Sequence, residues 1–131
     1  MQGGIAASAA VVGLLIALPV FAHHGSASYD NGKRVTLKGT VTEWVYSNPH
    51  CLLKVDVKGE DGKVVPWIAE GQAPNVIFPS GYRKDTFKPG DQVTLIVEPS
   101  KDGRSIGRIL QTVLADGKTL GPASSGQAAA P

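Results

Sequence analysis

The chain has 131 residues and a formal net charge of +2, a length that suits one domain. So small a net charge argues against nucleic acid or an anionic membrane surface as the partner. The single cysteine, Cys51, excludes an internal disulfide.

Residues 1–22 contain no Asp, Glu, Lys or Arg, and the run from Ile5 to Ala22 is almost wholly apolar. Val20 and Ala22 are small residues at the positions that a signal peptidase prefers. We therefore interpret residues 1–22 as a secretory signal peptide, which makes the protein periplasmic or secreted and starts the mature chain at His23. The alternative is an uncleaved membrane anchor, because the apolar run is close to the shortest length that spans a bilayer.

Residues 23–32 are small and polar, and we expect an N-terminal arm there. Period-two alternation of apolar residues then predicts five strands, at about 35–46, 51–58, 64–70, 93–98 and 106–114. Gly39 predicts a bend or bulge in the first strand, with a corner at residues 47–49 before the second. Pro74 and Pro79 leave room for a turn or two of helix between the third and fourth strands. Residues 121–131 have no apolar periodicity and predict a disordered tail.

This order of elements is typical of an all-β protein with a small five-stranded Greek-key barrel, the OB-fold, over residues 33–120. An immunoglobulin-like sandwich fits less well, because it needs about seven strands and a Cys…Trp…Cys spacing.

The alternation also assigns faces to the strands. Val35, Leu37, Val41 and Val45 share the face expected to be buried, which leaves Trp44 and Tyr46 on the polar face. Cys51 is expected in the core, on the face opposite His50, because successive strand residues point to opposite sides.

The predicted mature N-terminus suggests a metal site. The amine and imidazole of His23, the imidazole of His24 and that of His50 would form a nitrogen-rich set, which suits Cu(II), with Zn(II) as the runner-up. The candidate fourth ligands are Cys51, Glu70 and Asp30. The alternative is structural: the paired histidines are polar residues of a flexible arm, and His50 only caps the corner.

A second hypothesis needs no metal. An OB-fold interaction module would bind an envelope glycan or a protein partner through a surface with two tryptophans. Its candidate ligand-binding residues are Trp44, Tyr46, Trp67, Glu70 and Arg83. Alternatively, both tryptophans simply cover the barrel. The sequence contains neither a GxSxG nucleophile motif nor a phosphate-binding P-loop, so we expect a non-enzymatic binding protein. A purely structural or assembly role is a third possibility.

Several motifs together resemble a known family. They are Ala22-His23-His24, the segment VTLKGTVTEW, the Asn48-Pro49-His50 corner, Trp67 with Glu70, and the segment KPGDQV. Over residues 22–120 the chain resembles an uncharacterised family of small exported bacterial proteins, domain-of-unknown-function family 6152. The resemblance implies export and a small β-barrel-like domain, and it supplies no activity, cofactor or catalytic residue. Relatives commonly carry an apolar or aromatic residue after the Asn-Pro-His step, where this chain has Cys51.

Overall fold

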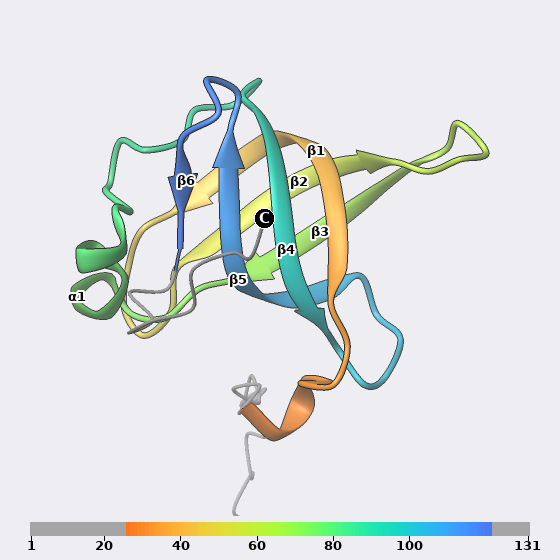
Figure 1. The fold of residues 1–131 in the computed structure, drawn as a ribbon, viewed down its shortest axis with the longest axis horizontal. Helices are drawn as coiled ribbons and strands as arrows, with labels where there is room; N and C mark the ends of the chain where they lie inside the picture. Colours follow the sequence, from red (N-terminus) through yellow and green to blue (C-terminus); the bar gives the residue numbers. More distant parts are fainter. Residues whose placement is uncertain (1–25, 122–131) are drawn as a thin grey trace, which may run out of the picture.

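The computed structural model describes residues 26–121, in which the strands close into one barrel (Figure 1). The strands are β1 (Val35–Val45), β2 (Leu52–Lys58), β3 (Val64–Glu70), β4 (Gln92–Pro99), β5 (Ile106–Leu114) and β6 (Thr119–Leu120). The sheet order is β3-β2-β1-β4-β5-β6, and a parallel pairing between β3 and β5 closes the circle of the first five strands. The predicted five-stranded barrel is therefore confirmed. The predicted signal peptide, His23, His24 and residues 122–131 of the predicted tail lie outside the described residues.

The first strand serves both halves of the barrel, and Gly39 lies where they meet. β1 pairs with β4 through Val35–Thr40 and with β2 through Gly39–Val45. A Cβ atom added at Gly39 would lie 2.9 Å from the carbonyl oxygen of Asp56. Glycine is needed here because the two backbones approach more closely than any side chain allows.

A β-bulge then reverses the faces of the rest of β1. The register with β2 shifts between Val41 and Glu43, so Trp44 comes opposite the fully buried Leu53. Trp44 consequently packs against the core, whereas Val45 pairs with the partly exposed Leu52. The placement of Trp44 on the polar face and of Val45 on the buried face was wrong, because one inserted residue exchanges the two faces of a strand.

The interior of the barrel is filled from the strands and from one long loop. Leu53, Val55, Leu95 and Val97 are almost completely buried, and Tyr82 and Phe87 enter the same cluster from the loop before β4. The Tyr82 hydroxyl lies 2.9 Å from Thr112 Oγ1, which satisfies both polar groups inside the core. Cys51 is also fully buried, as expected.

Short elements complete the chain. The predicted helix is present between β3 and β4 as α1 (Pro74–Ile77), followed by the 3-10 turn η2 (Phe78–Ser80). A second 3-10 turn, η1 (Ser26–Ser28, orange in Figure 1), begins the described chain. Within residues 26–121, no helix has the length and apolar character needed to cross a bilayer.

Gly39→Ala tests the close approach of β1 and β2. We expect it to lower the free energy of unfolding by about 1–3 kcal/mol, because the new methyl group meets backbone that cannot rotate away. Gly121→Ala is the matched control, since a Cβ there has nothing within 4 Å. Chemical denaturation of both variants measures the difference, and equal stabilities would contradict the close approach.

Candidate functional site

The corner between β1 and β2 places His50 on the outside of the barrel. The corner contains a cis Asn48–Pro49 peptide bond. The Cys51 amide donates to the Gln72 carbonyl (3.1 Å) and the Gly71 amide to the Cys51 carbonyl (2.8 Å), which continues the β2–β3 pairing into the corner. Cys51 therefore points inward and His50 outward, and the His50 side chain keeps 37% of its exposure.

Glu70 holds the His50 ring. Glu70 ends β3 opposite Leu52, so it lies diagonally across from His50 on the same face. His50 Nδ1 and Glu70 Oε1 are 2.8 Å apart, and the Glu70 side chain is only 13% exposed. A carboxylate accepts a proton donor, so this contact places a hydrogen on Nδ1; in the neutral imidazole the lone pair is then on Nε2.

The N-terminal arm is fastened to the same carboxylate. The hydroxyl of Tyr29 donates to Glu70 Oε2, and the Tyr29 side chain is 2% exposed. Burial, followed by the hydrogen bond to Glu70 and its charge, raises the pKa of Tyr29 well above its usual range. The Tyr29 phenol therefore stays neutral and donating near pH 7.

Backbone hydrogen bonds hold the arm in place on the other side. The Asp30 amide donates to the Pro99 carbonyl (2.9 Å), and the Lys101 amide donates to the Ser28 carbonyl (3.0 Å). Tyr29 itself forms a β-bridge with Ser100. The arm is thus a strap across the barrel wall, tied to the loop between β4 and β5.

An ion pair lies under this strap. Arg108 of β5 is opposite Glu70 in the parallel pairing and opposite Glu98 in the antiparallel one. Its Nε donates to Glu98 Oε2 at 2.9 Å, and its guanidinium carbon is 5.7 Å from the centre of the Tyr29 ring. Arg108 therefore pairs with Glu98 beside the Tyr29 ring that ties the strap to Glu70.

The other candidate metal ligands lie elsewhere. Cys51 faces the core, where burial raises the pKa of its thiol. Asp30 Oδ1 accepts the amide of Gly32 (3.1 Å). Among residues 26–121, His, Cys, Asp and Glu side chains form no group of three or more that could hold a metal ion. Of the predicted metal residues, His23 and His24 fall outside this part of the chain.

The predicted aromatic surface is divided among three places. Trp44, Tyr46 and Arg83 gather near the loop before β4, where Trp44 Nε1 donates to the Arg83 carbonyl (2.9 Å) and the Trp44 and Tyr46 ring centres are 5.8 Å apart. Trp67 is not among these contacts, and Glu70 lies with His50. The five residues therefore do not form one surface.

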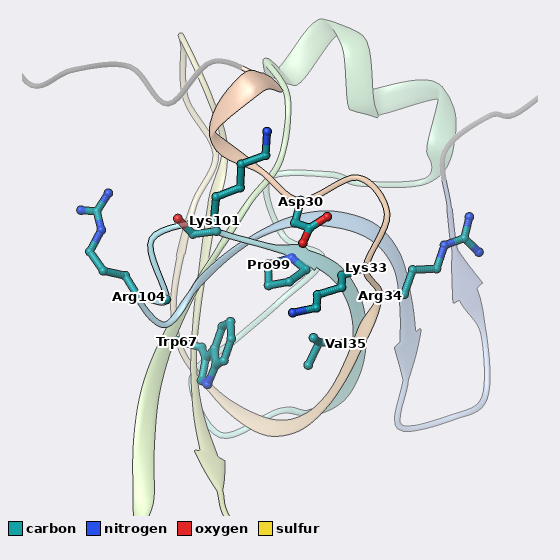
Figure 2. A pocket seen from close by; sticks show the side chains of 10 residues that line it. Asp30, Lys33, Arg34, Val35, Trp67, Pro99, Lys101 and Arg104 are labelled. Carbon is teal, nitrogen blue, oxygen red and sulfur yellow. The ribbon is translucent and has the colours of Figure 1, made fainter.

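Trp67 instead lines a cavity of about 460 Å³ that sequence reasoning missed (Figure 2). Its basic lining residues are Lys33, Arg34, Lys101 and Arg104. The sequence contains a signal for this cavity. Lys33 and Arg34 come just before β1, and Lys101 and Arg104 follow β4. Antiparallel pairing brings the start of one such strand beside the end of the other. Tyr29 and Arg108 carried no comparable signal.

These features define a small OB-like β-barrel with an N-terminal strap. The chain belongs to a family of unknown function, DUF6152, whose model matches residues 11–109. The family resemblance indicated by the sequence motifs is therefore confirmed. No curated protein matches the sequence significantly.

Tyr29→Phe tests the attachment of the strap. The variant is expected to lose about 1–2 kcal/mol of stability at pH 7, because it removes a hydrogen bond to a charged acceptor. A phenol whose pKa is raised by folding stabilises the protein below its ordinary pKa of about 10 and loses this contribution as pH rises. The deficit of Tyr29→Phe relative to wild type should therefore shrink above about pH 10.

Urea denaturation at neutral and alkaline pH measures both effects. Tyr46→Phe is the matched control, because the Tyr46 hydroxyl donates to neutral acceptors, the carbonyls of Pro74 (3.3 Å) and Tyr82 (3.5 Å). A Tyr29→Phe variant as stable as wild type at pH 7 would contradict the role of the strap.

Proposed function

We propose that the protein is an exported, non-enzymatic copper-binding protein, periplasmic or secreted. The proposed ligands are the amine and imidazole of His23, the imidazole of His24 and that of His50. One observation supports this proposal above the others: Tyr29 and His50 occupy the two oxygens of the same carboxylate, Glu70. The arm that carries the paired histidines is therefore attached beside the only histidine of residues 26–121.

The orientation of the His50 ring suits metal coordination. Metal-binding histidines usually donate their other ring N–H to a carboxylate, which fixes the tautomer and makes the ligating nitrogen more basic. His50 donates from Nδ1 to Glu70, so Nε2 is the nitrogen for a metal. In this proposal Glu70 orients the metal-binding histidine, whereas the sequence suggested Glu70 as a fourth metal ligand or as part of a glycan- or protein-binding surface.

The chain is long enough to bring the ligands together. His24 precedes Tyr29 by five residues, and Ser26–Ser28 between them form a 3-10 turn. At about 2.0 Å per residue in that turn and about 3.3 Å per residue elsewhere, this part of the arm spans up to about 13 Å. The Tyr29 hydroxyl and His50 Nδ1 are both within hydrogen-bonding distance of Glu70. Only the Glu70 carboxylate therefore separates the Tyr29 hydroxyl from His50, so His50 lies close to the point where the arm is attached.

The donor set favours one metal. An amine and imidazoles are nitrogen donors, and such sites hold Cu(II) more tightly than Zn(II) in the general order of divalent-metal affinities. The amine exists only if cleavage occurs before His23, so the site would form after export.

A titration with Cu(II) tests the need for the free amine. The protein beginning at His23 is compared with the same protein acetylated at its amino terminus and with one extended by Gly-Ser-Gly-Ser. Both changes should weaken Cu(II) binding by about 100-fold, equivalent to about 2.7 kcal/mol. A single added residue is unsuitable, because it would place His24 third and create a different chelate.

Parallel titrations with Zn(II) should give weaker binding to the protein that begins at His23. Equal Cu(II) affinities for the free, acetylated and extended forms would contradict the N-terminal chelate.

A further inference from the structure

The cavity beside Trp67 has walls from three segments, two of which are tied together by backbone hydrogen bonds. They are residues 30–35 before and at the start of β1, residues 99–104 at the end of β4 and in its following loop, and Trp67 of β3. The Asp30–Pro99 and Lys101–Ser28 backbone hydrogen bonds join the first two segments. The cavity is therefore preformed, and its volume of about 460 Å³ lies in the range of about 300–1,000 Å³ found for small-molecule sites.

Its lining combines a flat apolar wall with positive charge. Trp67 presents its ring to the cavity and Val35 lies across from it, while Lys33 extends toward the ring (Figure 2). Arg34 and Arg104 extend outward on opposite sides (Figure 2). A ligand stacked on Trp67 would therefore meet one cation inside the cavity and others at its rim.

We propose that this cavity binds an acidic saccharide, namely a sugar ring that carries a carboxylate or a phosphate. The faces of a sugar ring carry C–H groups that pack on an indole ring, and the anionic substituent would pair with Lys33. Four basic side chains and one acidic one line the cavity, and an excess of positive charge remains after Arg104 is paired with Asp102. This excess favours an anion over a neutral sugar.

The loop after β4 fixes the position of the Arg104 side chain at the rim of the cavity. Asp102 accepts from Ser100 Oγ (2.7 Å), from the Arg104 amide (3.1 Å) and from Arg104 Nε (2.6 Å). The Ser100 hydrogen bond, followed by the Arg104 backbone, lowers the pKa of Asp102 to about 2. The loop thus keeps the same charged arrangement throughout the neutral pH range.

A single-ring ligand explains the site better than a nucleic acid does. Proteins that bind single strands use successive aromatic side chains along a basic groove. Among the described lining residues Trp67 is the one aromatic side chain, and Trp44 is engaged with the Arg83 carbonyl in a different cluster. Metal binding is a separate question, because neither His50 nor Glu70 is among the described residues that line the cavity.

The two tryptophans allow a direct test by NMR of the whole mature chain. The indole N–H signals of Trp67 and Trp44 are followed during titration with glucuronate, glucose 6-phosphate, glucose and inorganic phosphate. The Trp67 signal should move with either acidic sugar while the Trp44 signal stays. The stronger of the two acidic sugars identifies the carboxylate or the phosphate as the preferred group. Glucose and inorganic phosphate should bind at least about tenfold more weakly.

Matched variants assign the effect to the cavity. Lys33→Gln should weaken acidic-sugar binding by about tenfold, whereas Lys84→Gln, which removes the same charge from an exposed residue outside the lining, should not. Trp67→Leu should remove binding, and the Trp44 signal reports whether that variant is folded. An unmoved Trp67 signal, equal binding of glucose or of inorganic phosphate, or tighter binding of an oligothymidylate would overturn the proposal.

Discussion

Replacing Gly107 with valine is expected to prevent normal closure of the barrel and to cost about 3 kcal/mol or more of stability. Gly107 lies opposite Ala69 in the parallel β3–β5 pairing that closes the sheet. A Cβ atom there would be 2.6 Å from Val97 Cγ2 and 2.8 Å from Val97 Cβ. The two methyl groups of a valine at position 107 have no space, because the neighbouring Val97 is itself fully buried.

A double-mutant cycle separates this contact from other effects. Gly107→Ala alone should be less damaging than Gly107→Val, and combining it with Val97→Ala should recover part of the loss. Chemical denaturation of the single and double variants measures the coupling. Strictly additive free energies would contradict a direct clash between residues 97 and 107.

Removal of the His50 imidazole is expected to weaken Cu(II) binding by about 100-fold, and Glu70→Gln by about tenfold. His50→Ala removes a proposed ligand, whereas Glu70→Gln leaves the ligand but removes the charge that orients it. Glutamine also offers a single carbonyl oxygen where Tyr29 and His50 each donate to an oxygen of the carboxylate.

Glu43→Gln is the matched control for the Glu70 variant. Glu43 is exposed, and its Oε2 lies 2.5 Å from Lys54 Nζ, so the substitution makes the same change in charge away from the site. Calorimetric titration with Cu(II) compares the variants with wild type. An unchanged affinity in His50→Ala, or equal losses in Glu70→Gln and Glu43→Gln, would contradict the role of the His50–Glu70 pair.

Much of the fold could be predicted from the sequence because period-two alternation directly reports which strand faces are buried. The predicted strands at 64–70 and 106–114 coincide with β3 and β5. Proline and glycine placed the corner before Cys51 and the short helix before β4. β6 was not predicted, because two residues are too few for an alternation.

The sequence did not predict the features that depend on contacts between residues far apart in the chain. Sequence alone put the irregularity of β1 at Gly39, whereas the bulge follows Val41 and turns Trp44 inward. The Tyr29–Glu70 contact joins residues 41 positions apart, and nothing in the polar arm distinguishes Tyr29 as its anchor. Likewise, the basic residues of the cavity meet only because β1 and β4 are neighbours.

The most direct test of the copper proposal is mass spectrometry, under non-denaturing conditions, of the native protein after export into copper-containing medium. We expect a chain that begins at His23 and carries one copper ion, and a smaller share of copper-loaded chains for His50→Ala. A chain that begins at another residue, keeps residues 1–22, or carries no copper would contradict it.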